Sequence, residues 1–372
     1  MKVVLAFDSF KGSLSAMEAC RIAADALGEV KSDLEVALVP LADGGEGTAA
    51  ALMNARPAEW ISVPATGPLA SLCVDAGFAW FAFDKTALVE TASASGLTLL
   101  RRDQLNPLAT STRGTGELVR AAVEYGTQRI LLAAGGRATV DGGMGAAHAL
   151  GWRFLDQHGA ELAPCGGNLE AIARIVPPAT RNLPILEVLC DVTNPLLGER
   201  GAARVFGPQK GATHAMVERL ERGLQNLANV IRQDLDLAVD DIPGAGAAGG
   251  LGAGALAFLG ARLVRGIDVV MREVDFDTTL AGADWIISGE GTFDATSLEG
   301  KVVSGVLARA RAAGCRVAVL AGRLKLDPET WTRAGVAYAA ALATPTLSTE
   351  DAIRLAPELL RDQVLLFARE WL

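Results

Sequence analysis

The sequence lacks most features typical of secreted proteins and of proteins stabilised by a structural metal ion. Its cysteines form no C-x-x-C pair, are odd in number and lie far apart: Cys20, Cys73, Cys165, Cys190 and Cys315. This pattern excludes a disulfide framework and a zinc-ribbon type of site, and it predicts reduced, buried thiols. The N-terminal apolar run is too short for a signal peptide and predicts a β-strand instead. Together these observations favour a cytoplasmic protein.

Long runs of large apolar side chains are also missing. The uncharged stretch of 18 residues from 244 to 261 contains seven glycines and many alanines. It therefore predicts a glycine-rich loop leading into a packed helix rather than a membrane span. Positive charge is in deficit, because 34 basic residues face 43 acidic ones and leave a net charge of −9. Such a chain repels polyanions, which argues against nucleic acid and anionic membranes as main partners.

Several catalytic signatures are absent. The sequence has no Walker A motif, no H-R-D or D-F-G signature of protein kinases and no G-x-S-x-G serine elbow. The segment GAGAAG at 244 to 249 matches a dinucleotide fingerprint, with Asp268 near the acidic position. However, a polar DDIP segment precedes it where a buried strand is required. A nicotinamide-dependent dehydrogenase is thus the weakest alternative.

Both ends of the sequence alternate short β-rich runs with helical periods. The first strand is expected at 2 to 9, and Ser15 with Glu18 forms a capping box at the start of a helix. A second strand at 34 to 42 is followed by a glycine turn and another helix. The C-terminal end repeats this order. Strands are expected at 283 to 291 and 315 to 322, a helix at 302 to 314 and a terminal helix at 349 to 371. This alternation predicts a parallel sheet with right-handed crossovers.

The middle of the sequence has a different pattern. Three segments between 60 and 93 resemble antiparallel strands, and a helix with a glycine C-cap follows at 115 to 126. A chain of 372 residues exceeds what one hydrophobic core usually supports. We therefore predict an α/β protein of two domains. They are a discontinuous Rossmann-like or flavodoxin-like parallel-sheet domain, residues 1 to 60 plus 283 to 372, and an inserted mixed α/β domain, residues 61 to 282.

One short segment of the middle, AGGRATVDGGMG at 134 to 145, places five glycines around Arg137 and Asp141. It lies between a predicted buried strand and a predicted helix. At such a turn unpaired backbone N–H groups converge and the helix dipole favours negative charge, so the segment suits an anion such as phosphate. Asp141 either fixes this loop or faces a metal ion.

The chain has seven such turns, and most of them hold a charged residue. The sequence GEGT occurs twice, at 45 to 48 and at 289 to 292, each time after an apolar strand. If both strands belong to one parallel sheet, both turns start from its carboxyl edge, where open α/β sheets bind ligands. Ordinary turn chemistry is the alternative for any single loop. Seven such loops indicate a shared site.

Two kinds of charged residue stand out in these turns. Only seven of the 34 basic residues are lysines, and three of them adjoin glycine turns: Lys11, Lys210 and Lys301. A lysine is a compact charge for phosphate oxygens, although it can also be a solvated surface group. Four aspartates stand at predicted strand ends: Asp8, Asp43, Asp191 and Asp294. Such carboxylates can hold Mg²⁺ or accept a hydroxyl proton, or else form Asx-turns and N-caps.

The glycine loops follow one another in a fixed order: FDSFKGSLSA, PLADGGEGT, STRGTGEL, GG-x-AT-x-DGGMG, CDVTNPLLG, FGPQKGA, PGAGAAGGLG and SGEGTFD-x-x-SLEGK. Together they resemble the bacterial glycerate kinase family, of the type that commonly forms 2-phosphoglycerate, over about residues 2 to 345. The resemblance implies ATP-dependent phosphorylation of D-glycerate with Mg²⁺. It also implies two α/β domains with the active site in the cleft between them. The expected partners are D-glycerate and ATP, and a homodimer is left open.

The family motifs imply site residues at their matching positions in this sequence. Five are expected to be catalytic: Asp8, Lys11, Asp43, Asp191 and Asp294. Asp191 and Asp294 are also the expected metal ligands. The residues expected to bind substrate or phosphate are Ser9, Glu46, Gly135, Gly136, Arg137, Asp141, Asn194, Lys210, Gly246, Glu290, Lys301 and Arg323.

Some positions depart from the family pattern: Phe7, Arg137, Val140, Thr292 and Arg323. Two small polar positions have become arginine, and the arginine usual at position 292 is lost. We hypothesise that Arg137 or Arg323 supplies that positive charge as a relocated phosphate or carboxylate clamp. The alternatives are a family branch whose loops differ without functional change, and a non-catalytic sensor of glycerate or a sugar acid. The acidic residues at 8, 43, 191 and 294 all remain, which favours an active enzyme.

Overall fold

The computed structural model describes residues 1 to 344 and 346 to 372 and divides into two compact units. The first comprises Met1–Asp43, Ala50–Arg56 and Arg265–Leu372, and the second comprises Gly44–Ala49 and Pro57–Val264. Both chain ends therefore lie in one unit. Residues 265 to 282 belong to the first unit, whereas the sequence analysis assigns them to the inserted domain. The predicted domain boundaries, and the predicted cleft, stay predictions.

The first unit is built on a five-stranded sheet in which every pairing is parallel. Its strand order is β15-β13-β11-β1-β2. The strands are β1 (Lys2–Phe7), β2 (Glu35–Leu38), β11 (Trp285–Gly289), β13 (Arg316–Ala321) and β15 (Tyr338–Ala341). The predicted parallel α/β architecture is confirmed, and its central strand pair joins the two ends of the sequence.

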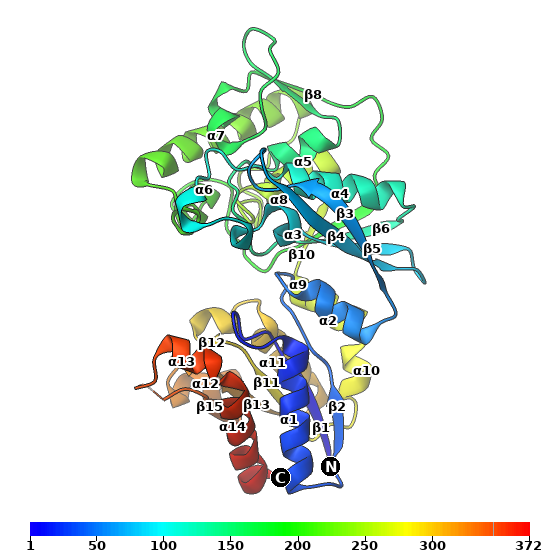
Figure 1. Cartoon of the computed structure of the whole chain (residues 1–372), viewed down its shortest axis with the longest axis vertical. Coiled ribbons are helices and arrows are strands. Elements are labelled where there is room, and N and C mark those ends of the chain that lie inside the picture. The colour runs from blue at the N-terminus through cyan, green and yellow to red at the C-terminus, as the bar shows by residue number, and fades with distance from the viewer. Residues whose placement is uncertain (345) are drawn as a thin grey trace. The chain divides into compact units, whose positions relative to one another are not determined.

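Helices α1 (Ala16–Val30) and α14 (Ala356–Trp371) lie side by side against the sheet of this unit (Figure 1). The predicted capping box is present, since the Glu18 N–H donates to Ser15 Oγ and the Ser15 N–H donates to Glu18 Oε2. Alternate residues of β1, including Leu5 and Phe7, are fully buried in the core that these helices cover. The other helices of the unit are α9 (Gly266–Glu273), α10 (Phe276–Leu280), α11 (Val302–Ala313), α12 (Pro328–Ala334) and α13 (Thr349–Arg354).

The prediction of one terminal helix over 349 to 371 is wrong. The chain forms α13 and then α14, with Leu355 between them at φ −95° and ψ 5°. Pro357 lies in the first turn of α14 and has no N–H to donate to the preceding turn. The break follows from this missing hydrogen bond, because proline is tolerated at a helix start and disfavoured inside one.

The second unit contains a six-stranded mixed sheet of order β10-β9-β6-β5-β4-β3. Strands β3, β4 and β5 pair antiparallel, as predicted, and β5, β6, β9 and β10 pair in parallel. Their bounds are β3 (Glu59–Thr66), β4 (Cys73–Phe81), β5 (Thr86–Glu90), β6 (Arg129–Ala133), β9 (Ile185–Leu189) and β10 (Arg262–Val264). A separate antiparallel pair consists of β7 (Arg153–Leu155) and β8 (Arg174–Val176).

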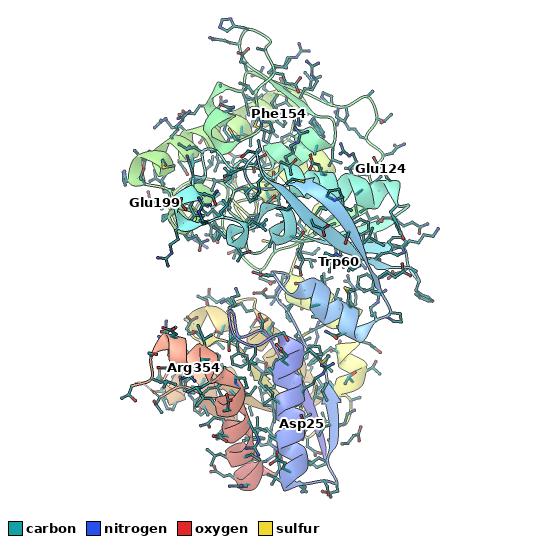
Figure 2. The ribbon with its side chains drawn as sticks, in the orientation of Figure 1. Asp25, Trp60, Glu124, Phe154, Glu199 and Arg354 are labelled. Carbon is teal, nitrogen blue, oxygen red and sulfur yellow. The ribbon has the colours of Figure 1, made fainter. Side chains whose placement is uncertain are left out.

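The helices of the second unit cover this sheet and fix its loops. They are α3 (Thr91–Ser95), α4 (Arg113–Glu124), α5 (Met144–Ala149), α6 (Ala202–Phe206), α7 (His214–Leu235) and α8 (Leu251–Leu259), while α2 (Thr48–Ala55) begins in this unit and continues in the first. The predicted course of 244 to 261, a glycine-rich loop and then a helix, is confirmed by α8. Phe154, labelled in Figure 2, packs edge-to-face on Phe258 of α8 with ring centroids 5.4 Å apart. Across the described ranges, no helix is both long and apolar enough to span a bilayer.

All five cysteines are free thiols. Cys20 is buried, as predicted, and burial raises the pKa of its thiol to about 12. Cys73 is exposed, so the prediction of burial is wrong for this residue. Cys73 opens β4 opposite Thr66 at the end of β3.

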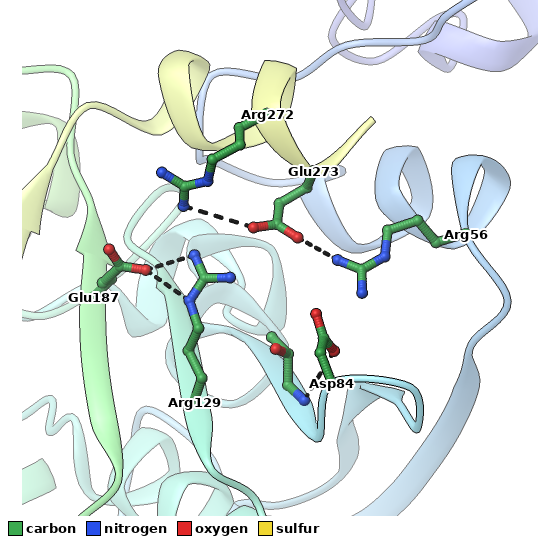
Figure 3. A network of polar contacts seen from close by, with 7 residues as sticks. Arg56, Asp84, Arg129, Glu187, Arg272 and Glu273 are labelled. Carbon is green, nitrogen blue, oxygen red and sulfur yellow. Dashed lines mark hydrogen bonds and ion pairs between the residues drawn. The ribbon is translucent and has the colours of Figure 1, made fainter. Parts of the chain in front are cut away.

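Ion pairs connect elements within each unit (Figure 3). In the first unit Glu273 pairs with Arg56 and, at 3.6 Å, with Arg272. In the second, Arg129 of β6 donates from Nε, at 2.8 Å, and from a terminal nitrogen, at 2.6 Å, to Glu187 of β9. The latter pair bridges neighbouring parallel strands and therefore helps to fix their register.

Two glycines inside helices provide a stability test. A Cβ on Gly116 of α4 would meet the backbone of Ala146 in α5, 2.6 Å from its Cα, whereas a Cβ on Gly28 of α1 would meet nothing within 4 Å. We expect Gly116→Ala to destabilise the fold by about 1 to 3 kcal/mol through overpacking. Gly28→Ala is the matched control and should stabilise it by up to about 1 kcal/mol through helix propensity. Urea unfolding of both variants measures these changes, and equal effects of the two substitutions would contradict the close α4–α5 approach.

Candidate functional site

A pocket of about 380 Å³ lies at the carboxyl edge of the first unit's sheet. Four of its lining residues directly follow strands: Asp8 after β1, Glu290 after β11, Gly322 after β13 and Leu342 after β15. Carboxyl ends of parallel strands meet at one edge, so residues far apart in the sequence are brought together there. The volume suits a small molecule or part of a larger one.

Four carboxylates line this pocket: Asp8, Asp43, Glu290 and Asp294. Burial, together with the Asp43 and Glu290 charges, raises the pKa of Asp8 to about 7. The Ser9 N–H, which donates to Asp8 Oδ1 at 2.6 Å, and the Lys11 charge act in the opposite direction. Burial also raises the pKa of Glu290. Asp8 thus has the pKa of a group that exchanges protons near neutral pH.

The cations of the pocket come from separate loops: Lys11, Lys301 and Arg323. Arg323 donates to Thr349 Oγ1 at 2.6 Å, which holds the guanidinium beside α13. The short strands β12 (Thr292–Phe293) and β14 (Arg323–Leu324) pair in parallel, with Thr292 directly opposite Arg323. The arginine at 323 therefore lies next to the position where the family pattern expects one. Its role as a relocated clamp stays a prediction.

Asp294 lines the same pocket and caps a short 3-10 turn, Ala295–Leu298. Its Oδ1 accepts hydrogen bonds from the Thr296 N–H at 3.0 Å and from Thr296 Oγ1 at 2.7 Å. The hydrogen bond from the Thr296 hydroxyl is the largest of the effects that lower the pKa of Asp294. The N-cap alternative for Asp294 is thus observed, while its predicted role as a metal ligand stays a prediction.

The apolar wall of the pocket was not predicted from the sequence. This wall consists of Phe10, Leu342, Ala352, Ile353 and Leu359. Most of it comes from α13 and α14, which the sequence pattern predicts as one terminal helix. The position of the segment that forms α13 could have indicated this wall. The segment follows the last strand of the parallel sheet, so it starts from the carboxyl edge of that sheet.

In the second unit, the glycine segment at 134 to 145 lies between β6 and α5, as predicted. Asp141 is fully buried there, and its Oδ2 accepts from the Thr112 N–H at 2.7 Å and from Thr112 Oγ1 at 2.8 Å. The N–H groups of Gly143 and Gly145 also donate to this carboxylate, each at 3.2 Å. Asp141 therefore fixes the loop, and it already engages N–H groups at the start of α5.

Close backbone packing accounts for one of these glycines. A Cβ on Gly135 would lie 2.5 Å from the Cα of Gly45, in the first GEGT segment. The Ala134 N–H donates to the Gly44 carbonyl at 3.0 Å beside this contact. Both strands that precede the GEGT segments belong to one parallel sheet, as predicted, but the first segment itself packs within the second unit.

Arg137 and Lys210 are both buried near Asp141. Arg137 donates to Thr91 Oγ1 at 3.2 Å, and Lys210 donates to the Thr139 carbonyl at 2.5 Å. Desolvation lowers the pKa of Arg137 to about 9 and that of Lys210 well below its usual range. Arg137 and Lys210 are thus both removed from solvent, and the charge of the Asp141 carboxylate acts on both.

Asn194 and Gly246 meet in the same unit. The Gly246 N–H donates to the Asn194 carbonyl at 3.0 Å, and Asn194 Nδ2 donates to the Arg200 carbonyl at 2.7 Å. A Cβ on Gly246 would collide with the Pro195 carbonyl. These contacts give both residues a structural reason for their identity.

The structure therefore divides the expected site residues between the two units. Those gathered by the pocket of the first unit are Asp8, Ser9, Lys11, Asp43, Glu290, Asp294, Lys301 and Arg323. Those in the second unit are Glu46, Gly135, Gly136, Arg137, Asp141, Asp191, Asn194, Lys210 and Gly246. In the part of the chain that the structure describes, no group of three or more His, Cys, Asp or Glu side chains forms a metal cage.

Both units are similar to known proteins, because the matches cover nearly the whole chain. Residues 3 to 372 match the model of the glycerate kinase family. A glycerate kinase of Halalkalibacterium halodurans is 41% identical over 96% of this chain and 95% of its own length. The glycerate 2-kinase of Escherichia coli K12 is 40% identical over 95% and 93% of the two chains. A crystal structure assigned to glycerate kinase 2 of Salmonella typhimurium LT2 has a TM-score of 0.85 and 40% identity, covering 99% of this chain and 97% of that one. The chain therefore belongs to the glycerate kinase family and is an enzyme of the phosphotransferase class.

Proposed function

We propose that this protein phosphorylates D-glycerate with ATP and that the product is 2-phosphoglycerate. The family and the names of the relatives support the substrate, and the glycerate 2-kinase among them supports the product. The observation that carries the proposal is the pocket in which Asp8, with a pKa raised to about 7, lies among lysine and arginine side chains. Such a set can accept a proton and stabilise negative charge in one place.

The chemistry of phosphoryl transfer needs positioning and charge neutralisation more than covalent participation of the protein. In the proposed reaction Asp8 accepts the proton of the attacking hydroxyl, for which a pKa near neutrality is suited. Lys11, Lys301 and Arg323 supply positive charge to phosphate oxygens. The apolar wall excludes water from one side of the pocket and so disfavours hydrolysis.

The donor set of the pocket fits Mg²⁺. Glu290 is 7% exposed, and its Oε1 has no hydrogen-bond partner in the described residues. Magnesium is usually bound through one or two carboxylates together with substrate phosphates, so a complete protein cage is not required. We propose Glu290 and Asp43 as its ligands, in the pocket that the predicted ligand Asp294 also lines. The other predicted ligand, Asp191, belongs to the second unit and stays a prediction. When bound, the ion would neutralise phosphate charge during transfer.

The dehydrogenase alternative has no support in the GAGAAG segment. Its glycines pack against backbone, with Gly246 on Pro195 and Gly249 on Thr139. The segment leads into α8 from a loop rather than from a strand of the sheet. Close packing therefore explains the glycines without a bound dinucleotide.

A direct assay tests the proposed function. ADP release should depend on ATP, Mg²⁺ and D-glycerate together, and ³¹P NMR should identify the product as 2-phosphoglycerate. A product signal of 3-phosphoglycerate would reject the proposed regiochemistry and keep the kinase. Saturable glycerate binding without turnover would instead support the sensor alternative.

The raised pKa of Asp8 gives a prediction for pH. The kcat/KM should rise as pH increases through about 7, because Asp8 must lose its proton to act as base. Asp8→Asn should lower kcat by about 10² to 10⁴. The folded-state pKa lies above the unfolded one, so Asp8 lowers stability progressively as pH rises from about 4 to about 7. The variant should therefore be at least as stable as the wild type at pH 8.

The matched control is Asp25→Asn on the exposed side of α1 in the same unit (Figure 2). It should leave both the pH profile and the unfolding midpoint unchanged. If Asp8→Asn keeps the acidic limb of the kcat/KM profile, another group titrates there and Asp8 is not the base.

A further inference from the structure

The apolar wall of the first unit's pocket has a composition that a small acid does not explain. Its members are Phe10, Leu342, Ala352, Ile353 and Leu359. Phe10 and Leu342 are buried, whereas Ile353 is 41% exposed and Ala352 and Leu359 are half-buried. D-glycerate carries a hydroxyl or a carboxylate on each carbon and offers these side chains little apolar surface. The exposed part of the wall therefore suits a ligand with an apolar face.

One face of α13 lines this pocket. Thr349, Ala352 and Ile353 are spaced by three and four residues, so they are neighbours on the helix surface, and all three line the pocket. Arg323 donates to Thr349 Oγ1 at 2.6 Å, which places a cation at the first turn of this face. Ile353 lies about 6 Å further along the helix axis. The face therefore passes from a positive charge to apolar side chains within about one helical turn.

The Ser13 hydroxyl joins α13 to the loop that carries Asp8 and Lys11. It donates to the Ile353 carbonyl at 2.8 Å, from a position 340 residues earlier in the sequence. Pro357, four residues after Ile353, has no N–H for that carbonyl, which leaves room for the serine. The apolar wall and the loop with the proposed proton acceptor are thus held together within the first unit.

Of the two substrates in the proposed reaction, only the nucleotide combines phosphates with a flat apolar ring. Its phosphates need cations, which Lys11, Lys301 and Arg323 supply, and its base needs an apolar surface at some distance from them. In a nucleotide the ribose separates these two parts. In the pocket, a turn of α13 separates the Arg323 contact from Ile353 in the same way.

We propose that the apolar wall binds the nucleobase of the phosphoryl donor, with Ala352 and Ile353 of α13 as the residues that determine affinity for the base. The inference rests on the proposed function for the identity of the donor, which is ATP. The small side chain of Ala352 leaves space for a flat ring, and the exposed surface of Ile353 becomes buried against it. The first unit therefore holds the donor along its whole length, from the base on α13 to the phosphates on the lysines and Arg323.

A comparison of ATP with inorganic tripolyphosphate isolates the contribution of the base. Titration calorimetry of the full-length protein, with Mg²⁺ and without D-glycerate, gives a Kd for each ligand and needs no turnover. Ile353→Ser removes apolar surface and should raise the Kd for ATP by roughly threefold to thirtyfold. Ala352→Leu fills the space of the ring and should raise it by about tenfold or more. Both variants should keep the Kd for tripolyphosphate within about twofold of the wild type.

The matched control is Leu366→Ser on α14, an apolar side chain of the same unit that is 53% exposed and lies outside the pocket lining. It should leave the Kd of both ligands unchanged. Kinetics of the same variants show which substrate uses the wall. The KM for ATP should rise with its Kd, while the KM for D-glycerate stays unchanged. A rise confined to the KM for D-glycerate would assign the wall to the acceptor and overturn the proposal.

The proposal and the proposed function fail in distinguishable ways. An unchanged Kd for ATP in both wall variants, with normal wild-type turnover, would refute the base site and keep the kinase. A wild type that binds ATP through the wall but does not turn over D-glycerate would refute the kinase and keep the base site. Equal losses of affinity for ATP and tripolyphosphate would show that the substitutions act on the phosphates or the fold, and would also refute the base site. If one wall variant does not fold, the other decides by the same criteria.

Discussion

The parallel pairing of β1 with β11 is the interaction on which the pocket depends. Its register places Phe7 opposite Gly289, so that Asp8 and Glu290 both follow the last paired residues. The pairing of β11 with β13 continues the same register and brings Gly322 and Arg323 to that edge. A shift of one residue in the first pairing would turn the side chains of β1 to the opposite face of the sheet and separate the two carboxylates. Strand register therefore places the Glu290 charge beside Asp8, where it adds to burial and the Asp43 charge in raising the pKa of Asp8.

Much of this arrangement can be read from the sequence, because the determining signals are local. The alternation of apolar strands with capped helices predicts the parallel sheet, and the aspartates at strand ends then fall at its carboxyl edge. The capping residues Ser15 and Glu18 fix the start of α1 without any tertiary information. The break before α14 was also accessible from Pro357, whose meaning depends on whether it lies in the first turn or inside a helix.

Other features could not be predicted, because they arise from contacts between distant segments. Gly135 and Gly246 are predicted to bind substrate or phosphate, whereas the structure packs each of them against the backbone of another segment. The burial of Lys210 and its position against the Thr139 carbonyl depend on the path of the chain 71 residues away. The apolar wall of the pocket likewise needs α13 to pass the end of β15. Local pattern identifies these residues, and only tertiary structure shows what they contact.

The position of β1 between β11 and β2 also bears on the order in which the chain can fold as it is synthesised. Until Gly289 has emerged from the ribosome, β1 has one neighbour, β2, and its other edge is unpaired. By then every residue of the second unit, which ends at Val264, has been made. Domains generally fold as units during synthesis. The second unit can therefore complete its core before β11 is available to pair with β1. An exposed strand edge can pair with another chain and so promote aggregation. The nascent chain is therefore most prone to aggregate in the interval before β11 is made.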